Sequence, residues 1–138
     1  MTTPLEVSVR PVKHGDQDAI QQLIEPFVDL QKLLPRTLAE LQELLATGFV
    51  AEHSGQIIGF AALEVYSAKL AEIRSLAVDR RYQGSGIGQR LVEACLQLAR
   101  QRQILEVMAI SSSESFFQSC GFDFTLPGEK KAFFFRTQ

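Results

Sequence analysis

Three glycines occupy every second position from 84 to 88, between an apolar segment that ends at Val78 and a periodic apolar segment that starts at Ile87. Glycine inside the first turn of a helix destabilises that helix by about 1 kcal/mol relative to alanine, so three of them need a reason. Backbone amides at the start of a helix attract anions, and the missing side chains let a phosphate approach them closely. A flexible turn is the alternative interpretation. We favour a phosphate-binding turn between a strand and a helix.

The spacing of these glycines argues against three common phosphate-binding motifs. It reads G-x-G-x-G, whereas a dinucleotide fingerprint reads G-x-G-x-x-G, and it lies in mid-chain instead of opening a βαβ unit. No Gly-Lys-Ser/Thr follows, as a P-loop requires. No His-Arg-Asp or Asp-Phe-Gly follows, as a protein kinase requires. A different class of phosphate-bearing ligand is therefore indicated.

Composition restricts the class of protein further. The chain has 138 residues, 46% hydrophobic and 22% charged, which predicts one globular domain over residues 1–138. A net charge of -2 offers no broad basic surface for nucleic acid. The longest apolar run, 57–63, is too short to span a membrane, and the N-terminus lacks a secretory signal. Cys95 and Cys120 form neither a disulfide framework nor a metal-ligand pattern. We predict a cytoplasmic protein without nucleic-acid, membrane or metal partners.

Hydrophobic periodicity predicts a mixed α+β domain with a central sheet of about seven strands flanked by about four helices. Strands are expected at 5–9, 49–52, 56–66, 70–78, 104–110, 122–126 and 131–136, and helices at 16–27, 37–45, 87–102 and 114–120. Thr37 and Glu40 have the spacing of a capping box, and Ser54-Gly55 is a hairpin turn signal. Pro26 is expected to end or kink the first helix. The apolar run 104–110 is typical of a strand buried on both faces.

Gln83-Gly-Ser-Gly-Ile-Gly88 resembles the Q/R-x-x-G-x-G/A acyl-CoA signature of the GNAT superfamily of N-acetyltransferases. The resemblance covers nearly the whole chain, and the order of the predicted elements agrees with that fold. It implies that acetyl-CoA is the acetyl donor and that its pyrophosphate binds to the amides of Gly84, Ser85, Gly86, Ile87 and Gly88. It also implies that the strand backbone at Leu76, Ala77 and Val78 binds the pantetheine arm. Arg80, Arg81 and Arg90 are either partners of the phosphates or solvated surface arginines.

The same resemblance suggests a general base. Glu72 lies six residues before Val78, which is similar to the strand glutamate that acts as the base in several members, often through water. The alternative is a structural glutamate paired with Arg74, which lies two residues on and on the same strand face. Many members carry a tyrosine four residues before a Gly-Phe pair, where this chain has Phe117. That difference leaves the acid that protonates the departing thiolate unassigned, with Ser112, Ser113, Ser119 or a water as open alternatives.

A second resemblance concerns the acetyl acceptor. Residues 33–37, 71–72, 116–117, 121–122, 126–127 and Lys130 are similar to the acetyltransferase domain of N-acetylglutamate synthases. The resemblance implies a stand-alone catalytic domain that acetylates the amine of a small amino acid, with L-glutamate as the leading candidate. Arg36, before a predicted helix start, is a candidate ligand of the substrate carboxylate, and Arg74 and Arg136 are two others. Each of the three also has a plain interpretation as a surface arginine.

Two other functions remain open at this point, acetylation of a protein amine and acyl-CoA sensing without catalysis. The latter is suggested by the missing tyrosine. Consecutive phenylalanines at 133–135 must face both sides of a strand. They suggest a homodimer that covers one side.

Overall fold

The computed structural model describes residues 6–30, 33, 36–124, 128 and 132–137. Its strands are β1 (Ser8–Pro11), β2 (Gly48–His53), β3 (Gln56–Val65), β4 (Leu70–Val78) and β5 (Glu106–Met108). Its helices are α1 (Gln17–Asp29), α2 (Leu38–Leu45), α3 (Ile87–Gln101) and α4 (Glu114–Ser119), and the 3-10 turn η1 (Arg80–Tyr82) precedes α3.

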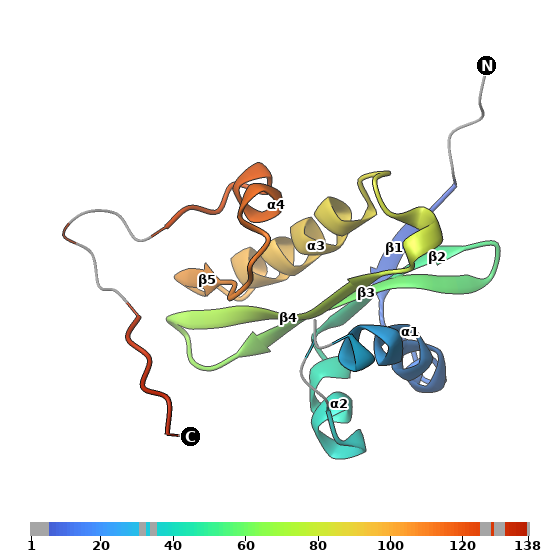
Figure 1. Ribbon diagram of the computed structural model, residues 1–138, viewed down its shortest axis with the longest axis horizontal. Helices are drawn as coiled ribbons and strands as arrows, with labels where there is room; N and C mark the ends of the chain where they lie inside the picture. Colours follow the sequence, from blue (N-terminus) through green and yellow to red (C-terminus); the bar gives the residue numbers. More distant parts are fainter. Residues whose placement is uncertain (1–5, 31–32, 34–35, 125–127, 129–131, 138) are drawn as a thin grey trace.

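The strands form one mixed sheet in chain order from β1 to β5 (Figure 1). β1 to β4 are antiparallel, and β5 runs parallel to β4 because the crossover helix α3 returns the chain to the same end of the sheet. The predicted turn between β2 and β3 is confirmed, since Ser54 and Gly55 both have a positive φ, as a two-residue hairpin turn requires. The sheet therefore holds β4, the strand before the glycines, between β3 and β5.

Helices cover both faces of the sheet (Figure 1). On one face, Leu91 and Cys95 of α3 are fully buried in a core with Leu63 of β3. On the other, Ile20 of α1 and Leu41 of α2 pack in a second core with Phe60 and Ala62 of β3. A side chain at Gly59 would bring a Cβ atom to 2.9 Å from Leu91 Cδ1, so this glycine allows α3 to approach the sheet. The two cores fix α3 and β4 relative to each other.

The helix signals in the sequence are largely confirmed. Thr37 and Glu40 form the predicted capping box at the start of α2. Pro26 does not end α1, which continues to Asp29. A proline removes one backbone hydrogen bond, and Ile20 and Ile24 anchor this helix in the core on one side. None of the helices formed by the described residues has the length and apolar character of a membrane span.

The C-terminal part of the sheet differs from the prediction. β5 is only Glu106–Met108, and Leu105 and Ile110 are exposed, so the expectation of a strand buried on both faces is wrong. Among the described residues, β5 pairs only with β4, which leaves its other edge uncovered. Residues 122–124 and 132–137 have no regular secondary structure, and the remaining residues of the two strands predicted at 122–126 and 131–136 lie outside the described residues. The described sheet thus has five strands where the sequence predicts seven. Phe133–Phe135 are exposed, and the homodimer stays a prediction.

Candidate functional site

A bulge in β4 shapes the site. Ala77 lies opposite Phe60 and Arg74 lies opposite Ala62, so two residues, Ser75 and Leu76, share the single partner Ala61. Ser75 has φ +56°, a left-handed conformation that is uncommon outside glycine and typical of such irregularities. The bulge resets the alternation of side chains along the strand. Ala77 therefore packs in the α1–α2 core, and Leu76 and Val78 pack against the α3 core.

β4 and β5 separate just before the bulge. Their parallel pairing covers only Leu70–Glu72 with Glu106–Met108, whereas β4 continues for six further residues to Val78. In the described part of the chain, no strand pairs with this edge of residues 73–78. Strand edges present backbone N–H and C=O groups to an extended ligand. The second half of β4 can therefore bind an extended, amide-containing molecule along its open edge.

The glycine turn follows directly. Gly84 and Gly86 have φ values of +85° and +82°, which residues with a side chain rarely adopt. Gly86 is the N-cap of α3, and no side chain of the described residues caps this helix start. The first backbone N–H groups of an uncapped helix are available to an anion. The conformation needed for a phosphate-binding turn is thus present.

A cavity of about 450 Å³ joins the end of β4 to the start of α3. Eight of the nine residues predicted to bind the cofactor line it: Leu76, Ala77, Val78, Gln83, Gly84, Gly86, Ile87 and Gly88. Ser85 is not part of the lining, and its hydroxyl donates to the carbonyl of Tyr82. The structure brings two separately predicted segments, the strand and the turn, into one pocket.

The cavity also includes residues that were not predicted to bind the cofactor. Phe27, Tyr82, Gln89, Ser113 and Phe116 complete the lining. Phe116 lies against α3, because a Cβ atom at Gly88 would come within 3.1 Å of its ring. Gly88 therefore serves the packing of α4 on α3 as well as the turn. The sequence singles out the Phe116-Phe117 pair before Gly121, but it does not indicate that Phe116 packs against Gly88.

Polar contacts hold the turn in place. The Gln83 side-chain amide donates to the carbonyl oxygen of Val78 at 2.9 Å, which ties the turn to the strand end. Asp79 pairs with Arg81, and the hydrogen bonds from Arg81 hold the pKa of the Asp79 carboxyl below its usual value. Arg90 donates to the carbonyl of Val7, and Arg80 is exposed. Arg80 is the one of these three arginines whose side chain makes no hydrogen bond within the described residues.

A second polar cluster lies on β3 and β4. Glu72 is the single charged residue that is buried among the described residues, with 6% of its surface exposed. Its Oε1 accepts a hydrogen bond of 2.6 Å from the Tyr66 hydroxyl and one of 3.3 Å from Arg74 Nη1. The same Arg74 nitrogen donates to Glu64 at 2.7 Å. Burial and the hydrogen bond to Glu72 raise the pKa of Tyr66 to about 12. Neighbouring Ala71 and Ile73 face the α3 core, so the cluster lies on the α1–α2 face.

The three arginines proposed as substrate ligands lie in different surroundings. Arg74 already contacts two carboxylates, and one of them is Glu72, the pairing that the sequence left open for Glu72. Arg36 is mostly buried beside the start of α2, with Nη1 at 3.7 Å from Glu40. Its buried Nε has no hydrogen-bond partner among the described residues. Arg136 is exposed in segment 132–137. A substrate role for each of them stays a prediction.

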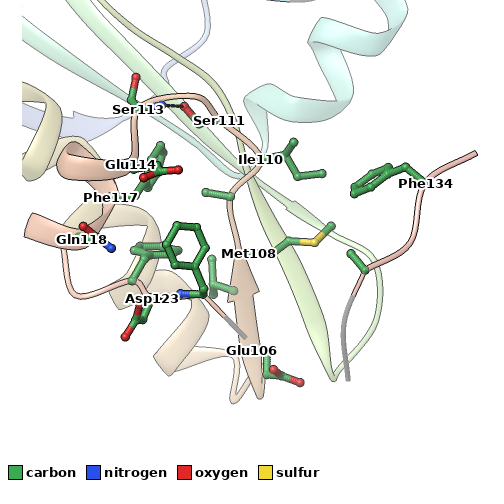
Figure 2. A pocket seen from close by; sticks show the side chains of 15 residues that line it. Glu106, Met108, Ile110, Ser111, Ser113, Glu114, Phe117, Gln118, Asp123 and Phe134 are labelled. Carbon is green, nitrogen blue, oxygen red and sulfur yellow. Dashed lines mark hydrogen bonds between the residues drawn. The ribbon is translucent and has the colours of Figure 1, made fainter. Parts of the chain in front are cut away.

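A larger cavity of about 1020 Å³ lies between β5, α4 and the C-terminal segment (Figure 2). None of the predicted site residues lines it. Phe117 faces this cavity and packs edge-on against Phe116 and Phe122, so its surroundings are apolar. No group of three His, Cys, Asp or Glu side chains in the described residues is arranged to hold a metal ion.

Comparison with known proteins agrees with this geometry. Residues 17–122 match the acetyltransferase (GNAT) family. An uncharacterised N-acetyltransferase of Chlorobaculum tepidum is 33% identical over 117 residues, which cover 85% of this chain and 76% of that protein. An amino-acid acetyltransferase of Mycobacterium tuberculosis is 37% identical over 117 residues, covering 83% and 67% of the two chains.

Two solved structures are also similar. The Mycobacterium tuberculosis protein Rv2747, in complex with CoA and a second ligand, has a TM-score of 0.78 and 35% identity, covering 86% of this chain and 74% of that one. N-acetylglutamate synthase of Neisseria gonorrhoeae, in complex with CoA and N-acetyl-glutamate, has a TM-score of 0.75 and 30% identity. That match covers 85% of this chain and 28% of the synthase. The family match spans most of the sequence and includes both the bulged strand and the glycine turn, and the chain therefore belongs to the GNAT family of acetyltransferases.

Proposed function

We propose that this acetyltransferase moves the acetyl group of acetyl-CoA to the amine of a small amino acid, with L-glutamate as the leading candidate. The observation that carries the proposal is the cavity that joins the open edge of β4 to the glycine turn. The names of the similar proteins support an amino-acid acceptor, because they include an amino-acid acetyltransferase and an N-acetylglutamate synthase.

In this proposal, acetyl-CoA lies along the cavity with its two halves on two elements. The amides of residues 84–88 bind the pyrophosphate at the start of α3, where the helix dipole favours negative charge. The pantetheine amides pair with the backbone of Leu76, Ala77 and Val78 on the open edge of β4. The thioester then lies close to the point where β4 and β5 separate, between the two cores.

Glu72 is the proposed general base. It removes a proton from the substrate ammonium, directly or through water, and the free amine attacks the thioester carbonyl carbon. A backbone N–H of Leu76–Val78 stabilises the oxyanion of the tetrahedral intermediate. The carbon–sulfur bond then breaks and the CoA thiolate leaves. The nitrogen loses its second proton to solvent and the thiolate takes up one from solvent, since Phe117 has no hydroxyl and a thiol is acidic enough to leave without a dedicated acid.

Arg36 is the best-placed ligand for a substrate carboxylate. Its guanidinium is mostly buried, and the buried Nε has no hydrogen-bond partner among the described residues. A buried donor without a partner is unfavourable, so a substrate carboxylate that accepts a hydrogen bond from Nε is stabilising. It precedes α2, which packs on the sheet face that carries Glu72. Arg74, by contrast, is neutralised by Glu64 and Glu72. Arg36 therefore favours an acidic amino acid as the substrate of the proposed reaction.

We expect Arg36→Met to lower kcat/KM for glutamate roughly 10- to 100-fold, mostly through KM, because a hydrogen-bonded ion pair to the substrate is lost. KM for acetyl-CoA should not change. Initial rates at varied glutamate and fixed acetyl-CoA measure both constants. Arg102→Met, at the exposed end of α3, is the matched control and should behave as the wild type. An unchanged KM for glutamate in Arg36→Met would contradict this assignment.

The reaction itself is tested by free-thiol release from acetyl-CoA. The purified protein is assayed with each of the twenty amino acids and without acceptor, and we expect release that depends on glutamate. Release with another small amino acid would keep the reaction and replace the substrate. Silence with all of them, while acetyl-CoA still binds, would contradict the proposed function and favour a protein amine or an acyl-CoA sensor.

A further inference from the structure

Tyr66 lies beside Glu72 although it is not part of β4. It follows the last residue of β3, and its N–H donates to the carbonyl of Leu70, which closes the turn into β4. Its side chain reaches across to Glu72, with 2.6 Å between the hydroxyl and Oε1. We propose that Tyr66 is a positioning residue that fixes the Glu72 carboxylate for proton transfer. This proposal rests on the proposed role of Glu72 as the base.

Within the cluster, Arg74 and Tyr66 make their shortest hydrogen bonds to different carboxylates. Glu64 and Glu72 lie directly opposite each other on β3 and β4, so two like charges need compensation. Arg74 Nη1 has two protons but three acceptors: Glu64 at 2.7 Å, Tyr66 Oη at 3.2 Å and Glu72 at 3.3 Å. The Arg74 guanidinium therefore makes its shortest hydrogen bond to Glu64 and its longest to Glu72.

The Tyr66 hydroxyl makes the short hydrogen bond to Glu72 that Arg74 does not make. It has one proton and two carboxylates within reach, Glu72 at 2.6 Å and Glu64 at 3.2 Å. The shorter distance assigns the proton to Glu72. Both donors to Glu72 meet its Oε1, and no hydrogen bond from the described residues ends at Oε2. In this proposal, Oε2 is therefore the oxygen left to accept a proton from the substrate ammonium or its bridging water.

A neutral donor suits this position. The Arg74 guanidinium already lies 3.3 Å from Glu72 Oε1, and a shorter contact would bring its positive charge closer to the proposed place of the substrate ammonium, where like charges repel. A phenol fixes the carboxylate without adding charge. Burial and the negative charge of Glu72 and Glu64 raise the pKa of Tyr66 to about 12, so the phenol keeps its proton and remains a donor at neutral pH.

A double-mutant cycle on turnover tests the proposal. We expect Tyr66→Phe, which removes one oxygen, to lower kcat about tenfold while KM for acetyl-CoA is unchanged, because the base is no longer held in line. In a Glu72→Gln background the same change should have no further effect, since the group that it positions is gone. An equal loss in both backgrounds, or no loss in the single variant, would overturn the role of Tyr66. Full activity of Glu72→Gln alone would overturn the base and leave the proposed reaction standing.

A second measurement needs no turnover. The chain has two tyrosines and no tryptophan, so Tyr82→Phe leaves Tyr66 as the single phenol in the ultraviolet absorbance. In that background, Glu72→Gln should lower the phenol titration midpoint, because a negative charge that opposes ionisation is removed. Glu114→Gln, an exposed carboxylate on α4, is the control and should leave the midpoint in place. A midpoint that does not move with Glu72→Gln would overturn the contact, whether or not acetyl transfer is found. Circular dichroism checks that each variant stays folded at the alkaline end.

Discussion

Gly86→Asp is expected to weaken binding of CoA by more than about 100-fold, which corresponds to roughly 3 kcal/mol. Gly86 adopts φ +82° at the N-cap of α3, so an aspartate there strains the turn and places a carboxylate beside the amides proposed to bind the pyrophosphate. An N-cap carboxylate also accepts the N–H groups that the phosphate needs. Isothermal titration calorimetry with CoA measures the loss.

Gly55→Asp separates binding from backbone strain. Gly55 has φ +77° in the exposed β2–β3 hairpin, with no atom within 4 Å of an added Cβ. The control therefore introduces the same residue at nearly the same backbone conformation, away from the cavity. It should bind CoA as the wild type does. If Gly86→Asp also bound CoA normally, the glycine turn would not be the phosphate site.

Glu72→Gln is expected to lower kcat roughly 100-fold or more, the range typical of a lost general base, without changing the affinity for acetyl-CoA. The amide is close in size and still accepts the Tyr66 hydrogen bond through Oε1, so the packing of this buried position is kept. Steady-state rates with glutamate over a range of pH values measure the effect.

The direction in which the loss of activity of Glu72→Gln changes with pH follows from the protonation of the substrate amine. At low pH the amine is protonated and needs the base, whereas at high pH free amine is already present. The deficit of Glu72→Gln should therefore shrink as pH rises. Glu64→Gln, directly across the strand pair, is the matched control and should lose much less. A pH profile of Glu72→Gln that equals the wild-type profile would mean that Glu72 is structural.

Much of the fold was predictable because its signals are local. A capping box, a two-residue turn and a run of alternating glycines depend on residues within a few positions of each other. The extent of strand 104–110 and the strands expected at 122–126 and 131–136 were not predictable in the same way, because their burial depends on partners distant in sequence. An apolar run such as that at β5 has the same pattern whether one or both faces are covered.

In the candidate site, too, some features have local signals in the sequence and others depend on residues distant in the chain. Residues Gln83–Gly88 could be chosen from the sequence because their glycine spacing suits a phosphate ligand, and Leu76–Val78 followed from the resemblance to the GNAT family. The bulge at Ser75 has no local signal of this kind. It arises where β4 has one residue more than β3 between two fixed pairs. Phe27 and Ser113 reach the cavity from elements that only packing brings there.

By itself, the sequence predicted the chemistry of the chain: an anion-binding helix start after a strand and, through the resemblance to the GNAT family, a glutamate on that strand as the base. The tertiary structure alone decided which side chains meet. It set Glu64 opposite Glu72, gave Arg74 to both carboxylates and brought Tyr66 to the second of them. The reason is physical: register between strands is set by turns, bulges and the burial of both sheet faces together, so no short stretch of residues contains it.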